Sequence, residues 1–319
     1  MILTLTANPS HDRTVTLASP LERGAVQRAA SVISQAGGKG INISRASVAA
    51  GVPSLAVLPA PADDPFVLEL LAAGIDCRAV EHPGELRSNI ALTEPDGTTT
   101  KVNTPGPAMT PATLDALTAA LHLRARPGDW VVLAGSLPPG TPDHWYADLV
   151  AALADCGAKI AVDTSEAPLH ELVKRLHVAA PHLMKPNGDE LASFTGQDPA
   201  RLEADPLAAA RAAADLVAAG VEAVLATLGP HGAVLVTAEG AWHATPPPTQ
   251  VVSTVGAGDS SLFGYLLGAI EDRSPAHRLA LAVAYGSAAA GLPGTTIPHP
   301  SHVTPGLVRV RDLHLTQGK

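Results

Sequence analysis

The stretch Val255-Gly256-Ala257-Gly258-Asp259 holds the residue types best suited to chemistry in this sequence. Val, Ser and Thr residues before it predict an extended segment, and apolar residues between positions 262 and 270 recur at helical spacing. Two glycines thus lie at a loop-to-helix junction, where unpaired backbone N–H groups and the helix dipole favour an anion. Asp259 falls in the first helical turn, where a carboxylate can act as a base. An ordinary turn with a capping acid would show the same pattern, and the stretch taken alone fits both interpretations.

Lys39 is placed where it works against helix stability. It lies in the glycine-rich stretch 37–40, just before a predicted helix over 41–49, and a cation at a helix N-terminus opposes the helix dipole. This placement is typical of a lysine that binds an anionic or hydroxyl-rich ligand, and Asn42, three residues on, projects from the same face. The alternative is a surface lysine beside a tight turn. The spacing of a Walker A loop is absent from the sequence.

Arg87 and Lys101 bracket a predicted hairpin. Strands over 87–93 and 98–103 are joined by the turn 94–97, which contains Asp-Gly, a good hairpin signal between alternating segments. We expect the two cations at matching positions on the two arms, where together they would suit a phosphate. Two solvated charges on a polar hairpin are the alternative.

Other polar residues lie at the ends of predicted strands. Asn187 and Glu190 have the spacing of a capping box, and their functional alternative is indirect coordination of Mg²⁺ near a triphosphate. Thr227-Leu228-Gly229 is either a binding turn for nucleotide phosphates or an ordinary turn. Ser136 offers a hydroxyl to a substrate, whereas Asp163 is interpreted as turn chemistry.

Predicted strands and helices alternate along most of the chain. Strands are predicted at 2–6, 13–17, 25–34, 55–58, 87–93, 98–103, 130–134, 159–163, 183–185, 223–227, 232–237 and 240–244. Helices are predicted at 41–49, 66–73, 111–123, 142–156, 168–177, from 187, at 205–219, from the glycine junction to about 270, and at 275–290, where the structured chain ends. This order predicts an α/β protein with a mostly parallel sheet covered on both faces, and ligands at the carboxyl ends of its strands. The early polar hairpins do not fit the alternation and predict a small accessory sheet.

Composition limits the classes of partner. Of 319 residues, 46% are hydrophobic and 16% charged, enough for a large core, and the net charge of −9 argues against nucleic acid or an anionic membrane. The N-terminus lacks the pattern of a signal peptide, and no apolar run reaches the length of a membrane span. Cys77 and Cys156 show no metal-ligand spacing, so we expect both to be reduced and buried in a cytoplasmic protein.

Seven segments, taken in order, resemble the PfkB (ribokinase-like) family of sugar kinases, most closely the branch that phosphorylates fructose 1-phosphate or tagatose 6-phosphate. They are TANPSHD, AGGKGINISRA, RSNIALTEPDG, AGSLPPGTP, KPNGDEL, TLGPHGA and VVSTVGAGDS. The resemblance covers nearly the whole chain. It implies one kinase domain over 1–319, a ribokinase-like three-layer αβα sandwich. It also implies a small β-sheet lid from about 11–34 and 86–104, through which a homodimer forms.

The resemblance also implies roles for individual residues. Asp259 matches the catalytic base, and the backbone amides of Gly256, Ala257 and Gly258 match the anion hole for the transferring phosphoryl group. The substrate-binding positions it implies are Asp12, Gly38, Lys39, Asn42, Arg87, Lys101 and Ser136. The nucleotide-binding positions it implies are Lys185, Asn187, Thr227, Gly229, Gly232, Ser253 and Gly258. Asn187 and Glu190 match an element that holds Mg²⁺ indirectly, through water.

The implied reaction is ATP-dependent phosphorylation of fructose 1-phosphate to fructose 1,6-bisphosphate. Ala91 stands where kinases of the 1-phosphate carry Lys, and Lys101 stands where some kinases of the 6-phosphate carry a basic residue, so the phosphate-binding set is mixed. Ser253 replaces an Asp that is common in the wider family, which weakens the case for a monovalent-cation site. The alternatives are fructose 6-phosphate, tagatose 6-phosphate, an unphosphorylated sugar or a nucleoside as substrate, or a non-catalytic sensor on the same fold.

Overall fold

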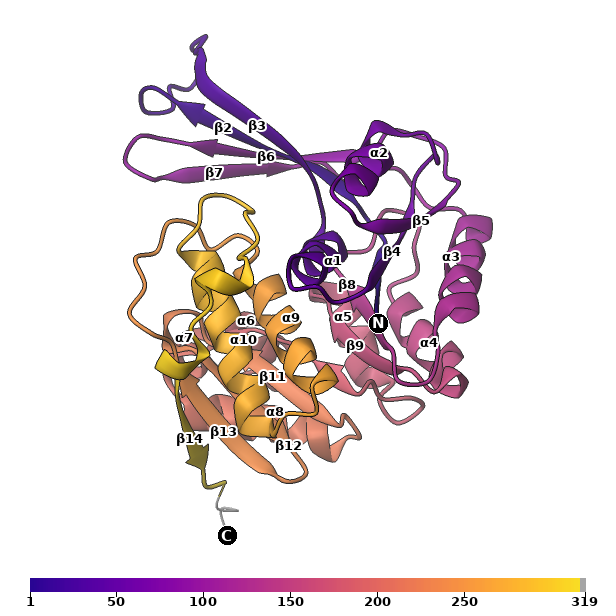
Figure 1. Cartoon of the computed structure of the whole chain (residues 1–319), viewed down its shortest axis with the longest axis vertical. Coiled ribbons are helices and arrows are strands. Elements are labelled where there is room, and N and C mark those ends of the chain that lie inside the picture. Colours follow the sequence, from indigo (N-terminus) through magenta and orange to yellow (C-terminus); the bar gives the residue numbers. More distant parts are fainter. Residues whose placement is uncertain (316–319) are drawn as a thin grey trace.

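A ten-stranded sheet forms the centre of the molecule, and the computed structural model describes residues 1–315 (Figure 1). Neighbouring strands from β11 to β5 run parallel, while β12, β13 and β14 join the other edge antiparallel. The strand order is β14 (Arg309–Leu313), β13 (Gly240–Thr245), β12 (Ala233–Thr237), β11 (Ala223–Thr227), β10 (Leu183–Met184), β9 (Lys159–Asp163), β8 (Trp130–Ala134), β1 (Ile2–Thr6), β4 (Ser54–Pro59) and β5 (Asp76–Val80). The predicted mostly parallel sheet is confirmed.

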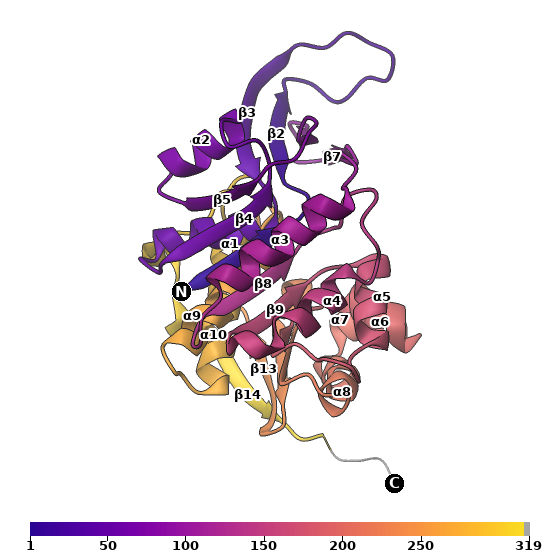
Figure 2. The same ribbon diagram turned by 90° about the vertical axis from the view of Figure 1, so that its right-hand side faces the viewer.

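Helices cover both faces of this sheet, which gives the three-layer αβα arrangement (Figures 1 and 2). One face packs against α1 (Lys39–Ala49), α9 (Ala257–Ile270) and α10 (Pro275–Ala290), with α2 (Pro65–Ala72) beside them. The other face packs against α3 (Pro111–Arg124), α4 (Trp145–Ala152), α5 (Glu166–Lys174), α6 (Gly188–Thr195), α7 (Pro199–Ala204) and α8 (Pro206–Ala218). In β8, Val131 and Leu133 enter one core while Val132 and Ala134 enter the other, so the whole strand is apolar.

Several helices start at an N-cap residue followed by proline. In α2, α3, α7 and α8 the side chain of an Asp or Thr accepts from a free backbone N–H of the first turn, and proline occupies a position that needs no donor. In α8, for example, Asp205 accepts from both Leu207 and Ala208. These caps fix where each helix leaves the sheet.

A second, four-stranded sheet projects beyond the sandwich (Figure 1). It contains β3 (Ala29–Gly37), β2 (Ser10–Leu17), β6 (Arg87–Thr93) and β7 (Thr99–Asn103) in that order, and we call it the small sheet. Asp12, Asn89 and Gln35 share one side, because they are register partners in adjacent strands. Thr295, in the loop after α10, donates to Gln35 at 3.4 Å, so this side faces the sandwich.

The structure differs from the predicted elements in a few places. The edge strands β5 and β14 and the short helix α7 are absent from the prediction, and the predicted end of structure at 290 is wrong because β14 follows. The predicted helix over 142–156 is shorter, with α4 at its centre. The segment before Val255 forms no strand, because the N–H groups of Val252 and Ser253 both donate to the Ala290 carbonyl at the end of α10. Both cysteines are free but only partly buried.

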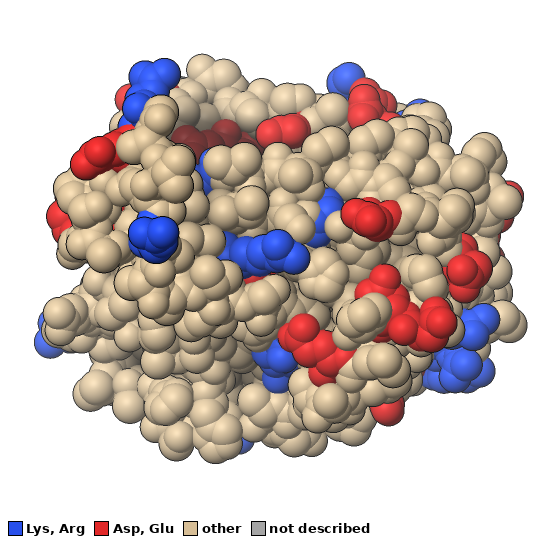
Figure 3. Space-filling view, turned by 90° about the horizontal axis from the view of Figure 1, so that it is seen from above, with Lys and Arg blue, Asp and Glu red and all other residues tan. Residues whose placement is uncertain are grey.

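Charged side chains are sparse and mixed in sign on the face seen in Figure 3. Lys and Arg are scattered among Asp and Glu there, without a continuous basic area. Within residues 1–315, no helix is long and apolar enough to cross a membrane.

Candidate active site

Asp259 lies in the first turn of α9, buried with 7% of its surface exposed. Asn42 Nδ2 donates to its Oδ2 at 2.8 Å, which ties α9 to α1. Burial, with a further contribution from the nearby Asp163 carboxylate, raises the pKa of Asp259 to about 6, against the lowering effects of Lys39, the Asn42 hydrogen bond and Lys185. A carboxylate with a pKa near 6 is ionised at neutral pH yet basic enough to accept a proton.

The glycines before Asp259 shape the start of α9. Gly256 is the N-cap with φ 78°, a left-handed conformation that strongly favours glycine. The Ala257 N–H donates weakly to the Thr254 carbonyl at 3.3 Å, whereas in the described part of the chain the amides of Gly256 and Gly258 have no protein acceptor. A Cβ on Gly258 would lie 3.4 Å from Lys185 Nζ, so an ammonium group lies beside these amides. Backbone amides and an ammonium group arranged in this way can bind an anion.

Asp163 joins two lysines at the carboxyl ends of β9 and β10. Lys39 Nζ donates to Asp163 Oδ1 at 2.8 Å. Lys185 Nζ lies 3.2 Å from Asp163 Oδ2, an ion pair whose angles do not complete a hydrogen bond. Burial favours the neutral forms of these groups, but the attraction between their opposite charges is stronger. The two lysines therefore lower the pKa of Asp163, and Asp163 and Asp259 raise the pKa of Lys39.

The interpretation of Asp163 as turn chemistry is therefore wrong. Asp163 is 1% exposed, accepts a hydrogen bond from Lys39, which is 124 residues away in the sequence, and forms an ion pair with Lys185. The signal that could have indicated its role is its place at the carboxyl end of a buried strand, where the ligands of parallel sheets bind.

The small sheet supplies a second polar group. Asp12 Oδ1 accepts from Ser10 Oγ at 2.8 Å and from Asn89 Nδ2 at 3.0 Å. A Cβ on Gly37 would collide with the Asp12 carboxylate, so glycine leaves it room. Gly38, the N-cap of α1, has φ 122°, and a Cβ there would lie 2.6 Å from a Thr6 methyl. The glycine-rich stretch thus brings the small sheet and Lys39 close to the main sheet.

Arg87 and Lys101 do not lie at matching positions, so that prediction is wrong. Lys101 pairs with Ala91, while Arg87 pairs with Ser10 in β2. Because Arg87 and Ala91 are four residues apart, they share a side of the sheet but stand about 13 Å apart along it. Arg87 Nε donates to the Asn8 carbonyl at 3.1 Å, and Lys101 is exposed. The two cations would therefore meet different parts of a ligand.

Residues 6–302 match the family described as pfkB family carbohydrate kinase. That match spans most of the chain and coincides with the site. The chain belongs to the pfkB family. Its predicted resemblance to this family is confirmed.

Several relatives of this pfkB chain are 1-phosphofructokinases. The one from Rhodobacter capsulatus is 37% identical over 306 residues, which cover 95% of this chain and 94% of the relative. The one from Escherichia coli (strain K12) is 34% identical and covers 90% of each chain. Among solved structures, phosphofructokinase-2 from Escherichia coli in complex with potassium has a TM-score of 0.86 at 28% identity, covering 94% of this chain and 96% of that one. Ribokinase from Arabidopsis thaliana, at 20% identity and a TM-score of 0.71 over 94% and 96%, shares the fold. The predicted ribokinase-like fold is confirmed.

Asn187 and Glu190 of this pfkB chain form the predicted capping box at the start of α6. Glu190 N donates to Asn187 Oδ1 at 2.8 Å, and Asn187 N donates to Glu190 Oε2 at 2.9 Å. Within residues 1–315, no three His, Cys, Asp or Glu side chains are grouped as a metal cage. Mg²⁺ usually keeps several waters and binds through one or two carboxylates plus substrate phosphates. The half-buried Glu190 therefore fits a water-mediated role.

The remaining predicted site residues have clear structural partners. Thr227 ends β11 and bridges to Asn187, which places both at one edge. A Cβ on Gly232 would collide with the Ala244 backbone carbonyl, so packing requires glycine there. At Gly229 a Cβ would meet only the end of the flexible Glu203 side chain, but φ is 51°, in the left-handed region that favours glycine. Ser253 Oγ donates to the Gly294 carbonyl at 3.1 Å. Ser136 is exposed and follows β8. Its neighbour Gly135 lies close to Lys39, because a Cβ added to Gly135 would lie 3.9 Å from Lys39 Cβ.

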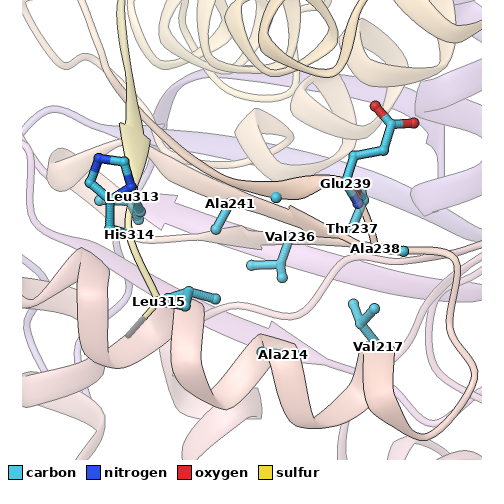
Figure 4. A pocket seen from close by; sticks show the side chains of 11 residues that line it. Ala214, Val217, Val236, Thr237, Ala238, Glu239, Ala241, Leu313, His314 and Leu315 are labelled. Carbon is cyan, nitrogen blue, oxygen red and sulfur yellow. The ribbon is translucent and has the colours of Figure 1, made fainter. Parts of the chain in front are cut away.

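A separate hollow lies at the opposite ends of the strands, between α8, the β12–β13 turn and the end of β14 (Figure 4). Its lining is mostly apolar, with Val217, Val236 and Leu315 among the side chains that Figure 4 labels. It contains none of the charged groups around Asp259, so it is not the candidate active site.

Proposed function

We propose that this pfkB kinase is a 1-phosphofructokinase, which transfers the γ-phosphoryl group of ATP to the 6-hydroxyl of fructose 1-phosphate. The products are fructose 1,6-bisphosphate and ADP. The observation that carries the proposal is the buried Asp259 beside the free amides of α9 and two lysines. Relatives with 34–37% identity over at least 90% of the chain support the choice of reaction.

In this mechanism Asp259 takes the proton of the sugar hydroxyl as the oxygen attacks the γ-phosphorus, and the bond to the ADP oxygen breaks. The amides of Gly256 and Gly258 and the Lys185 ammonium stabilise the charge on the transferring group. Lys39 holds the acceptor sugar beside Asp259. Mg²⁺, held through water by Asn187 and Glu190, would neutralise charge on the nucleotide phosphates. Thr227, Gly229, Gly232 and Ser253 would line the nucleotide.

On the sugar side, Asp12 and Asn42 bind hydroxyls, and Arg87 binds the phosphate of the substrate. The small sheet covers the sugar as a lid within one kinase domain. A specific observation favours 6-phosphofructokinase as the second candidate, because Lys101 faces the same side of the small sheet as Arg87. A solved phosphofructokinase-2 from Escherichia coli is in complex with fructose-6-phosphate.

We also propose that the small sheet forms a homodimer. Its side opposite Asp12 carries Val15, Val32, Ile90, Leu92 and Val102, contributed by all four strands. Val32 is 59% exposed and Val102 51% exposed. An apolar stripe of this kind marks a surface that another protein covers. The free thiols Cys77 and Cys156 suit the reducing cytoplasm, where we place the enzyme.

The test is ADP release with Mg-ATP against fructose 1-phosphate, fructose 6-phosphate, tagatose 6-phosphate, fructose, ribose and adenosine. We expect the highest kcat/KM with fructose 1-phosphate, and a fall in rate below pH 6 as Asp259 becomes protonated. Asp259→Asn should lower kcat by about 10²- to 10⁴-fold, the usual contribution of a general base, while ATP still binds.

A preference for fructose 6-phosphate would replace the proposed substrate and keep the kinase. Near-normal turnover by Asp259→Asn would remove Asp259 as the base. Silence across the panel with ATP binding intact would favour a non-catalytic sensor.

A further inference from the structure

Asp163 is a buried carboxylate that the proposed transfer does not use directly. Its two oxygens face two lysines that come from different elements, Lys39 at the start of α1 and Lys185 after β10. Burying a carboxylate costs free energy, which its two cationic partners offset here. A carboxylate that only ended a strand could lie in solvent, so the pairing itself needs an explanation.

The two lysines point toward different parts of the site. The side chain of Lys39 is 34% exposed, and its Cβ lies near Gly135, at the carboxyl end of β8. Lys185 is 5% exposed, and its ammonium lies against Gly258 at the start of α9. An ammonium group has three donors, so each lysine can contact Asp163 and still donate to a ligand. Asp163 therefore fixes the direction of two charges carried on flexible stems.

Asp163 also affects how the lysines interact with Asp259. The charged or titratable groups around the pair are Lys39 from α1, Tyr146 from α4, Lys185, Glu190 from α6 and Asp259 from α9. Without the Asp163 charge, Asp259 and the half-buried Glu190 would be the carboxylates left to interact with the two lysines. Both ammonium groups would then stabilise ionised Asp259 and weaken it as a base.

We propose that Asp163 is a positioning residue for phosphoryl transfer, which holds Lys39 at the acceptor sugar and Lys185 at the anion hole and keeps both from pairing with Asp259. This inference rests on the proposed kinase function. It assigns to one buried residue the relative placement of the two lysine ammonium groups beside Asp259.

The test compares Asp163→Asn with wild type in the ADP-release assay between pH 5 and 9. We expect kcat to fall by about 10- to 100-fold, as for other residues that orient functional groups, without a rise in KM for ATP. The acidic limb of kcat/KM should move to lower pH, because removing a negative charge beside Asp259 lowers the pKa of Asp259.

The matched control is Asp129→Asn. Asp129 is also a buried aspartate, 8% exposed, and pairs with the N-terminal ammonium at 3.1 Å, at the amino end of β8 away from the site. We expect this variant to lose stability and to keep the kcat and pH profile of wild type. If Asp163→Asn behaves like Asp129→Asn, Asp163 has a structural role alone and the inference is overturned.

A double-mutant cycle covers the case in which Asp163→Asn folds poorly. The variant with both Asp163→Asn and Lys185→Met removes one charge of each sign and so keeps the balance of the site. Because Asp163 acts through the lysines, the fold-loss of kcat in the double variant should be far smaller than the product of the fold-losses in Asp163→Asn and Lys185→Met alone. Multiplicative losses would contradict the inference. If wild type releases no ADP with any acceptor, the proposed function is overturned together with the inference. If wild type is active and the two losses multiply, the inference alone fails.

Discussion

At the scale of single residues, the site contains two buried carboxylates with opposite pKa shifts. Burial and a like charge raise the pKa of Asp259 to about 6, while two lysines lower the pKa of Asp163. Environments that separate the pKa values of neighbouring acids assign them different roles. One acid can therefore exchange a proton near neutral pH, and the other stays ionised as a fixed charge.

The sequence predicts the placement of those site residues whose partners are close to them in the chain. The first-turn position of Asp259 and the capping box of Asn187 and Glu190 depend on neighbours within a few positions, and the structure has both. The role of Asp163 depends on Lys39, which is 124 residues away in the sequence, so no local pattern indicates the contact. The relation of Arg87 to Lys101 depends on strand register, which the sequence of the turn does not fix, and in the structure Lys101 pairs with Ala91.

Arg87 and Lys101 allow a prediction about the substrate phosphate. Arg87→Ala should raise KM for fructose 1-phosphate by about 10- to 100-fold and leave KM for ATP unchanged, since a hydrogen bond to a charged group contributes about 1.5–3 kcal/mol. Lys101→Ala, on the same side of the sheet, is the matched control and should change either KM less than threefold. Steady-state kinetics with each substrate varied gives both values. A larger effect from Lys101→Ala would place the phosphate farther out along the small sheet.

At the scale of elements, the central strands were predictable and the edges were not. β8, β9 and β11 have the predicted bounds, because strands buried on both faces are short apolar runs between breakers. The edge strands β5 and β14 read Asp-Cys-Arg-Ala-Val and Arg-Val-Arg-Asp-Leu, in which charged residues face solvent and hide the pattern. They form because a neighbouring strand is present to pair with, which is tertiary information.

The packing of α9 against α10 supports the site from behind and gives a stability prediction. A Cβ on Gly264 would lie 2.8 Å from the Leu281 carbonyl carbon and 2.9 Å from Ala282 Cα, all backbone atoms that cannot turn aside. Gly264→Ala should therefore lower the free energy of unfolding by about 1–3 kcal/mol, the usual cost of overpacking. Thermal or urea unfolding measures the change.

Gly188→Ala is the control for this prediction. Gly188 is also helical, at the start of α6, but the nearest atoms to its Cβ lie 3.4 Å away, which is ordinary contact. Its stability should change by about 0.5 kcal/mol or less, as for most substitutions outside tight packing. Equal stability of the two variants would show that α9 and α10 can move apart without cost.

At the scale of the whole molecule, the small sheet separates two environments. One side, with Asp12, Asn89 and Arg87, faces the site, and the other side is apolar and open. A four-stranded sheet outside the main core has little apolar area of its own to bury against the sandwich. A second copy placed on the open side would supply that area and would fix the sheet over the sugar, so dimer formation and substrate binding are linked in this proposal.

This link can be tested through the oligomeric state of the protein in solution. Wild type should sediment with twice the chain mass at micromolar concentration, and a variant with Val32→Lys and Val102→Lys should sediment as a monomer, since two buried lysines without partners oppose association. Leu123→Lys, at a residue 68% exposed on α3 away from the small sheet, is the control and should stay dimeric. In the monomeric variant the KM for the sugar should rise above the wild-type value more than the KM for ATP does, because the lid over the sugar is less ordered. A monomeric wild type would overturn the proposed homodimer, and a double variant that remains dimeric would place the contact between copies outside the small sheet.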